Sequence, residues 1–404
     1  MCYQYKYDYR NRLVEKKLPG KQWEFIVYNS QDMPVATGPA YNPWGASEET
    51  DIGWLITKYD SFNRVVYTGW YTGKDVNSIE RAKYQAEQNG LLTPYESVSV
   101  SSSFDNLPLG YTNNVEPIAS FKLLTINYYD NYNYSNAPTI PTTMPHSSFP
   151  IASNVNGLQT GSWVRALDNP NNTNGEVSYT IYDNKYRPVQ TETTNHLGGY
   201  TRVDTNLDWA GKTIYTITKH KRTSSDTDIV IKDMFEYSPQ DKLVLHKQQI
   251  NQLAEQLIAK NTYDELGQLI SKNVGGEDVS GSSSLQKVDY TYNIRGWLKS
   301  INDVLDIESE NDLFAFKINY NDYDSHGSND VASTPLYNGN ISSTYWITSA
   351  DNVLRKYNYS YDNLNRLLEA NYLKPQSSSY FDNYLEQISY DKNGNITSLY
   401  RNGN

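Results

Sequence analysis

The sequence predicts a mainly β protein made of antiparallel hairpins that repeat along the chain, with one short surface helix. Short tyrosine-led phrases recur at steps of roughly 25–30 residues, as between positions 182, 207, 237, 263 and 292, and such a period is typical of stacked or wound repeats. Hydrophobic and polar residues alternate before the phrases, as they do in β-strands. The 404 residues also exceed the ~250–300 that usually share one core, which favours a repeat array.

The aromatic composition indicates a thin wall of sheet rather than a globule with a thick apolar core. The chain holds 37 Tyr but 9 Phe, and its hydrophobic content is 38% with Tyr included. Tyr combines an apolar ring with a polar hydroxyl. It therefore suits a sheet along which the rings lie while the hydroxyls reach water or backbone.

Each phrase has the composition of a tight turn between two strands. In the stretch Tyr359–Tyr372, Asp362 opens the turn because its short side chain can accept the N–H two residues later. Three residues on, Asn365 stands where positive φ is needed, and Gly and Asn tolerate that conformation best. Arg366 and Leu367 then begin the return strand, and the leucine is expected on the same face as the leading Tyr.

The same pattern recurs in seven clear copies and in weaker copies at 27–35, 207–214 and 237–244. One Tyr-Asp pair could act as a proton-transfer dyad, but so many near-copies cannot all be active sites. We therefore interpret the pairs as structural and assign no catalytic, cofactor-binding or metal-binding residue. The predicted turn residues are Tyr7, Asp8, Arg12, Tyr59, Asp60, Arg64, Tyr182, Asp183, Arg187, Tyr263, Asp264, Gly267, Tyr292, Asn293, Gly296, Tyr361, Asp362, Arg366, Tyr390, Asp391 and Gly394.

One stretch interrupts the repeats and divides the chain into three regions. Hairpin repeats are expected over 1–71, and a helix followed by a strand-and-loop excursion rich in Ser, Asn, Pro and Tyr over 72–162. Further hairpins, continuous with the first region, are expected over 163–404. Helical propensity also marks 253–260, but a repeat turn follows at once, so we expect its later half to be a strand.

The predicted helix lies near 75–89. Asp75 would cap its first turn, and Asn89 with Gly90 would end it. The helix is expected to pack on the sheet through one apolar stripe, formed by Val76, Ile79, Ala82 and Ala86.

Charge and cysteine content exclude several function classes. The net charge is −11 and the pI about 5.0, which argues against a nucleic-acid-binding surface. The single Cys2 excludes an internal disulfide framework and a cysteine-rich zinc site.

The sequence contains no apolar run of about 18 residues, so it predicts no segment that inserts into a membrane. The N-terminus lacks the segments of a signal peptide, so we expect that Met1 does not begin the natural precursor and that both ends are cut.

Few motifs point to chemistry. The stretch from Asp322 to Gly327 resembles the start of a calcium loop, but His326 replaces the third ligand and Ser333 stands where the loop needs Glu. Nucleotide-binding and nucleophile motifs are missing. A glycoside-cleaving enzyme would need two carboxylates that meet in a cleft, and sequence alone leaves this third function open.

A carbohydrate-binding or adhesion surface is the main alternative to a structural role. Exposed aromatic rings can stack on sugars or on partner proteins. The aromatic run Tyr128–Ser135 could present rings in this way, as could Trp70, Trp163 and Trp346.

Several long phrases resemble the YD-repeat, or RHS-repeat, family, and most closely a subgroup met in Bacteroidetes-type bacteria. The phrases that carry this resemblance are Cys2–Lys21, Asn261–Gly276, Val288–Asp303 and Pro335–Ser342. The similarity extends over nearly the whole chain and is weakest over 97–153. It implies a β-ribbon that spirals into a hollow shell, as in RHS toxins, insecticidal toxin-complex shells and teneurins.

The resemblance also implies a function. Such shells enclose a C-terminal toxic domain or serve cell-surface contact, whereas this chain lacks the self-cleaving core domain and any toxin domain. We therefore expect a non-catalytic, cofactor-free shell segment of a larger secreted or cell-surface protein. Its expected partners are the rest of its own precursor, namely the core and toxin-type domains, together with glycans or cell-surface receptors. Nucleic acid is not an expected partner.

Overall fold

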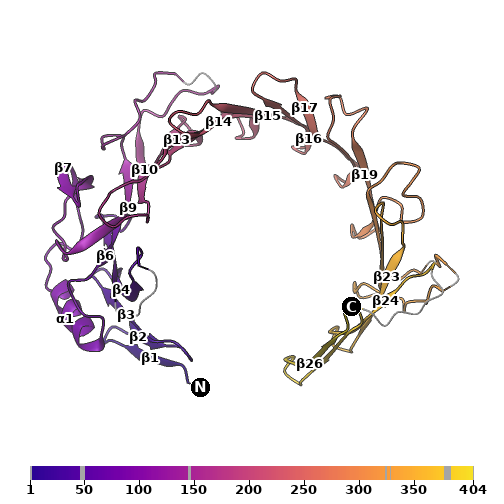
Figure 1. Ribbon diagram of the computed structural model, residues 1–404, viewed down its shortest axis with the longest axis horizontal. Helices are drawn as coiled ribbons and strands as arrows, with labels where there is room; N and C mark the ends of the chain where they lie inside the picture. The colour runs from indigo at the N-terminus through magenta and orange to yellow at the C-terminus, as the bar shows by residue number, and fades with distance from the viewer. Residues whose placement is uncertain are drawn as a thin grey trace. The chain divides into compact units, whose positions relative to one another are not determined.

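The computed structural model describes residues 2–45, 51–143, 147–323, 325–327, 329–376 and 384–403. Within these residues the chain is mainly β. One antiparallel sheet holds 24 strands, β7 and β8 form a separate hairpin, and α1 is the one α-helix (Figure 1). The predicted fold class, antiparallel hairpins with one short helix, is confirmed. The chain divides into two compact units, unit 1 (Met1–Lys232) and unit 2 (Asp233–Asn404).

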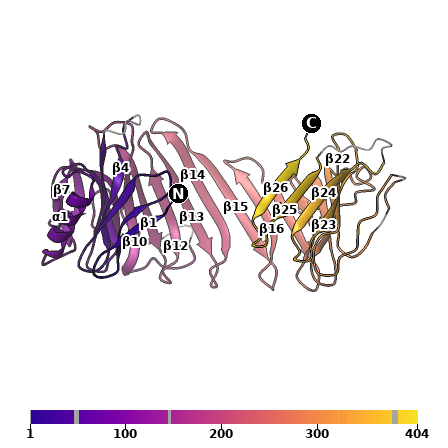
Figure 2. The ribbon, with the colours of Figure 1, turned by 90° about the horizontal axis from the view of Figure 1, so that it is seen from below.

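Unit 1 is a meander in which each strand pairs with the next, except that β6 pairs with β9 across the helix and the small hairpin. The later strands of the unit continue the same antiparallel order (Figure 2). Its elements are β1 (Gln4–Tyr7), β2 (Leu13–Lys17), β3 (Trp23–Tyr28), β4 (Pro34–Tyr41), β5 (Ile52–Tyr59), β6 (Val65–Tyr71), α1 (Ser78–Asn89), β7 (Val98–Phe104), β8 (Leu107–Tyr111), β9 (Phe121–Asp130), β10 (Val155–Arg165), β11 (Gly175–Tyr182), β12 (Pro188–Thr194), β13 (Gly198–Leu207) and β14 (Thr213–Thr223).

Unit 2 follows the same plan, and β15 (Ile229–Tyr237) spans the boundary in sequence. From β16 onward, consecutive strands pair antiparallel. The predicted strand in the later half of 253–260 is confirmed by β17. The strands are β16 (Leu243–Ile250), β17 (Gln256–Tyr263), β18 (Leu269–Val274), β19 (Gln286–Tyr292), β20 (Leu298–Ile301), β21 (Phe314–Asn319), β22 (Ser343–Thr348), β23 (Arg355–Tyr361), β24 (Leu367–Leu373), β25 (Glu386–Tyr390) and β26 (Ile396–Arg401).

The helix forms where it was predicted, but its cap and buried face differ. The side chain of Asn77, not Asp75, accepts the N–H groups of Ile79 and Glu80, as an N-cap does. The predicted stripe of Val76, Ile79, Ala82 and Ala86 is wrong, since Ile79 is 69% exposed. The buried residues are instead Tyr84, Gln85 and Gln88.

The large Tyr84 ring decides which side of α1 faces the sheet. It lies edge-on to Trp54 at 6.0 Å between ring centroids and packs against Tyr71. Gln85 adds two bonds to the backbone of Tyr28, accepting from its N–H and donating to its carbonyl. A buried aromatic ring and a satisfied amide stabilise this orientation more than two alanine methyls would.

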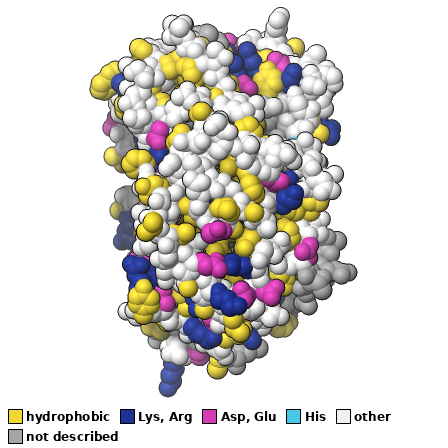
Figure 3. Space-filling model, turned by 90° about the vertical axis from the view of Figure 1, so that its left-hand side faces the viewer, with side chains coloured by type: hydrophobic (Ala, Val, Ile, Leu, Met, Phe, Trp, Pro, Cys, Tyr) yellow, Lys and Arg dark blue, Asp and Glu magenta, His cyan; other side chains and the backbone are white. Residues whose placement is uncertain are grey.

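The main hydrophobic core of unit 1 lies around strands β3 to β10 and includes rings from the excursion. Tyr134 stacks on Tyr128 at 4.0 Å, and Phe104 stacks on Phe121 at 4.1 Å. The aromatic run near Tyr128–Ser135 therefore places two of its rings in the core rather than on the surface. The face drawn in Figure 3 carries scattered hydrophobic side chains among basic and acidic ones.

Away from the main core of unit 1, the sheet buries few side chains. No residue of β14 or β16 is buried. Unit 2 has a small described core of Val304, Ile307, Ala315, Tyr345, Ile347 and Leu354. No helix in the described part of the chain is both long and apolar enough to cross a bilayer.

Candidate functional site

The seven clear tyrosine-led phrases form one kind of turn, built around the side chain of Asp or Asn. In the third copy, Oδ1 of Asp183 accepts the N–H groups of Lys185 and Arg187 at 2.9 and 3.0 Å. The N–H of Asp183 in turn donates to the carbonyl of Arg187. The same pair of side-chain bonds, to the residues two and four positions on, recurs at Asp8, Asp60, Asp264, Asn293, Asp362 and Asp391.

The residue three positions after each Asp or Asn adopts a left-handed backbone conformation. Its φ lies between 60° and 88° in every copy. Gly and Asn fill this position in six turns because they tolerate such a conformation at low cost. Tyr186 is the exception, with a φ of 61°. The residues are Asn11, Asn63, Tyr186, Gly267, Gly296, Asn365 and Gly394.

A β-bulge sits at the leading tyrosine of each copy. The register between the two strands shifts there, so that the tyrosine pairs with the residue six positions later. The bulge increases local twist and leads the chain into the turn. The pairs are Tyr7 with Leu13, Tyr59 with Val65, Tyr182 with Pro188, Tyr263 with Leu269, Tyr292 with Leu298, Tyr361 with Leu367, and Tyr390 with Ile396.

Arginine at the end of the turn joins it to a neighbouring turn. Nε of Arg366 donates to Oδ2 of Asp362 at 2.6 Å, and its Nη1 donates to the carbonyl of Asp391 in the following turn. Backbone and Arg366 hydrogen bonds lower the pKa of Asp362. Arg12, Arg64 and Arg187 make the same bond to their own Asp, and they reach Asp32, Asp130 and the carbonyl of Asp208, respectively.

Tyrosine hydroxyls provide a second link between hairpins. The hydroxyl of Tyr292 donates to the carbonyl of Leu269, the first residue after the preceding turn, at 2.9 Å. Tyr390 bonds Leu367 in the same way. Further members of this hydroxyl ladder are Tyr28 to Leu13, Tyr59 to Pro34, Tyr129 to Val65, Tyr182 to Gln159, Tyr263 to Leu243, Tyr320 to Leu298 and Tyr361 to Ile341.

The hydroxyl ladder explains why Tyr outnumbers Phe in this chain. A Phe ring could fill the same space but could not donate to the carbonyl that follows the previous turn. Arginines add to the link by lying over these rings, as Arg64 does over Tyr129 at 4.4 Å and Arg366 over Tyr390 at 4.6 Å. The high Tyr content predicted that tyrosine hydroxyls reach water or backbone. It could not identify the accepting carbonyl, because that carbonyl belongs to the preceding hairpin.

Removing one hydroxyl of the ladder is expected to weaken unit 2. We expect Tyr292→Phe to lower the free energy of unfolding by about 0.5–1.5 kcal/mol, because the carbonyl of Leu269 loses its donor. Urea unfolding followed by circular dichroism measures this change. Tyr290→Phe, two residues earlier on the same strand and without a described hydroxyl bond, is the matched control, and an equal loss in both variants would contradict the ladder.

Relieving the one unfavourable turn is expected to stabilise unit 1. Tyr186 holds a positive φ although its side chain is 57% exposed, so little packing opposes its removal. Tyr186→Gly should raise the free energy of unfolding by about 1 kcal/mol. Tyr9→Gly is the comparison, since that exposed turn tyrosine has no positive φ, and it should be neutral or destabilising. A loss of stability in Tyr186→Gly would refute the strain argument.

Of the three tryptophans considered as sugar platforms, Trp163 is buried, whereas Trp70 and Trp346 are half-buried. Trp163 is 6% exposed and belongs to the core, so its predicted exposure is wrong. Trp70 lies edge-on to Trp44 and donates to the carbonyl of Ala40. Trp346 stacks on Tyr357 and lies tilted to Tyr372.

The calcium-like stretch is occupied by other interactions. Asp322 pairs with Lys299 at 2.5 Å, and buried Ser333 contacts the hydroxyls of Ser342 and Ser343. Asp324 lies outside the described residues. Across the described ranges, no three His, Cys, Asp or Glu side chains gather in a way that could hold a metal ion.

Comparisons with known proteins give structural likeness only. No family model matches the sequence, and no curated protein matches it. Among solved structures, the chain is similar to the TcdB2–TccC3 protein, with 12% identity, a TM-score of 0.30, and coverage of 99% of this chain and 17% of that one. It is also similar to a mutant Photorhabdus luminescens Tc holotoxin pore, with 12% identity, a TM-score of 0.34, and coverage of 96% and 18%. The chain thus spans less than a fifth of the proteins it matches.

Proposed function

We propose that this chain is a non-catalytic wall segment of a larger secreted or cell-surface protein of the RHS-repeat type. In that protein it would enclose or present a C-terminal toxin-type domain. The observation that supports the proposal is the repeated link between hairpins. Tyrosine hydroxyls and arginines tie turns to their neighbours at many points, which suits a continuous wall.

The turns themselves suit a structural role better than a chemical one. Each turn carboxylate is used by two backbone N–H groups, and in four copies by an arginine as well. A catalytic base needs a lone pair free for substrate. Asp183, which is 0% exposed, cannot meet substrate without opening its turn.

Limited proteolysis of a longer protein tests the proposal. The chain should be expressed with the coding sequence found on each side of it in the genome. We expect an export signal upstream and a compact downstream domain that resists protease while joined to the wall. That domain, expressed alone, should be cleaved rapidly. Equal cleavage in both contexts, or no downstream domain, would refute the enclosing role.

The chain by itself is expected to self-associate through its outer strands. Every residue of β1 and of β26 is exposed, and the described pairing of each is with one neighbour only, β2 or β25. Unpaired strand edges are templates for further pairing. Sedimentation velocity should show association that rises with concentration, and Leu399→Lys on β26 should reduce it. A monomer at every concentration would contradict this expectation.

A further inference from the structure

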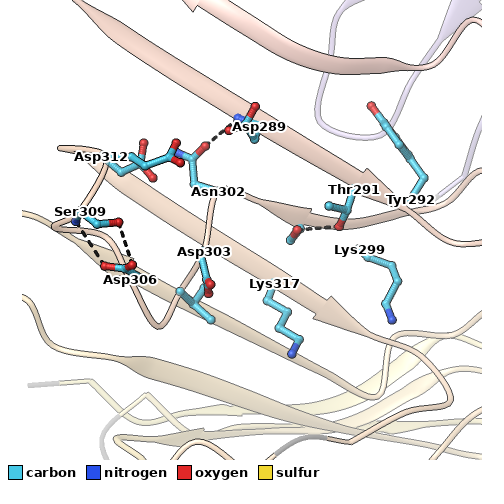
Figure 4. Close-up of a pocket in the computed structure, with 13 residues that line it drawn as sticks. Asp289, Thr291, Tyr292, Lys299, Asn302, Asp303, Asp306, Ser309, Asp312 and Lys317 are labelled. Atoms are coloured by element: carbon cyan, nitrogen blue, oxygen red, sulfur yellow. Dashed lines mark hydrogen bonds between the residues drawn. The ribbon is translucent and has the colours of Figure 1, made fainter. Parts of the chain in front are cut away.

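An open cavity of about 650 Å³ lies in unit 2, beside β19, β20 and β21 (Figure 4). The loop between β20 and β21 supplies much of its lining. Five carboxylates and two lysines line the cavity, so negative charge is in excess. The carboxylates are Asp289, Asp303, Asp306, Glu310 and Asp312. The volume suits a small organic group or a protruding side chain.

The lysines in and near the cavity pair with only some of the groups around it. Lys299 pairs with Asp322 at 2.5 Å, and Nζ of Lys317 lies 3.3 Å from Nε2 of His326. In Figure 4 both lysines lie away from Asp312. Lys287, outside the lining, pairs with Asp289 at 2.7 Å and lies 3.8 Å from Glu310. Lys287 offsets part of this charge, but with five carboxylates in the lining the acidic side of the cavity keeps a surplus of negative charge around Asp312.

One oxygen of the buried Asp312 carboxylate has no hydrogen-bond donor among the described residues. Its residue is 5% exposed, and within the described ranges its Oδ1 has no partner. Burial raises the pKa of Asp312, and the charges of Glu310 and Asp289 raise it further, while the charge of Lys287 lowers it. A buried carboxylate left unpaired costs free energy that a donating ligand would recover.

The backbone holds Asp312 in place despite this cost. Its N–H donates to the carbonyl of Ile307 at 2.9 Å, and Ile307 is buried in the small core with Val304 and Tyr345. On the other side, Asn302 accepts the N–H of Asp289 at 2.8 Å, which fixes the start of the loop. The loop is thus anchored at both ends, and the acidic side of the cavity is preformed.

We propose that this cavity binds a guanidinium or alkylammonium group, which donates hydrogen bonds to the carboxylate of Asp312 with Glu310 beside it. A guanidinium offers several N–H donors in the geometry that a carboxylate accepts. A divalent metal ion would need more oxygen ligands converging on one point, and the described residues contain no such group of three acidic or His ligands. An anionic ligand would meet the surplus of carboxylates. The site is independent of the wall function proposed above.

Calorimetric titration of the whole chain with L-argininamide and with spermidine tests the proposal. Saturable binding is expected at low ionic strength. Asp312→Asn should weaken it about tenfold, because the charged acceptor is lost. Glu310→Gln should weaken it by a smaller factor. Glu265→Gln, which removes a turn carboxylate outside the cavity lining, should leave binding unchanged.

Two results would overturn the assignment. One is equal binding by wild type and by both cavity variants, with circular dichroism confirming that the variants fold. The other is binding of Ca²⁺ or Mg²⁺ in a parallel titration that depends on Asp312 while argininamide and spermidine show none. If Asp312→Asn fails to fold, Glu310→Gln decides the question, because Glu310 is an exposed loop residue whose loss should not unfold the chain.

Discussion

Replacing Lys58 with Met is expected to lower the free energy of unfolding of unit 1 by about 3–5 kcal/mol. The Lys58 ammonium is buried and donates to Oε1 of Glu96, Oδ1 of Asn113 and the carbonyl of Val115, at 3.1, 2.5 and 2.6 Å. Burial lowers the pKa of Lys58 to about 8, so the amine is still mostly protonated at neutral pH.

The large effect arises because the partner of Lys58 would be left charged and buried. Glu96 is 0% exposed, and its remaining partners are Thr112 and the N–H groups of Asn114 and Val115. These are neutral donors and cannot replace a cation. Since Glu96 and Asn113 belong to the excursion, the lost pair is also one of the links between this segment and β5, beside the bond from the N–H of Glu96 to the carbonyl of Tyr59.

Urea unfolding followed by tryptophan fluorescence measures the change, since Trp54 is fully buried in the unit 1 core. Lys74→Met is the matched control. Its ammonium pairs at 2.8 Å with the exposed carboxylate of Glu87, so a loss of about 0–1 kcal/mol is expected. The double variant Lys58→Met with Glu96→Gln should recover part of the loss. A drop below about 1 kcal/mol in the single variant would contradict the role of the pair.

The repeat turns could be predicted from sequence because their interactions are local. Asp362, Asn365 and Arg366 lie within five residues, and the bonds among them follow from side-chain length and backbone preference. The bulge at Tyr361 follows from the same turn. Because the turn pattern recurs along the chain, the copies together predict a turn more strongly than any single copy does.

The remaining features depend on contacts that no local pattern encodes. Lys58 and Glu96 are 38 residues apart, and nothing near either one indicates its partner. The face of α1 was misassigned because a Tyr ring and Gln side chains, rather than alanines, meet the sheet. The cavity at Asp312 is lined by a loop outside the repeat pattern, so the excess of carboxylates there could be seen only once the loop was folded.

The second large expected effect is alkaline unfolding of unit 1 above pH 10. Burial raises the pKa of Tyr128 to about 12, and it raises the pKa values of Tyr67, Tyr84 and Tyr111 as well. In the unfolded chain these hydroxyls ionise near pH 10. Between pH 10 and the folded pKa values the folded state holds more protons, so stability falls as pH rises.

For Tyr128 alone, the loss between pH 9 and pH 12 should be about 2 kcal/mol, and the other buried tyrosines add to it. Urea unfolding at a series of pH values measures the fall. Tyr128→Phe is a sharp control, because the hydroxyl makes one long contact of 3.5 Å to the carbonyl of Pro108 and its removal should matter little at pH 7. The variant should lose about 2 kcal/mol less than wild type by pH 12. If the free energy of unfolding fell equally with pH in both proteins, the Tyr128 hydroxyl would have to contact solvent in the folded state. The stacked core around Tyr128 would then open far more readily than its packing implies.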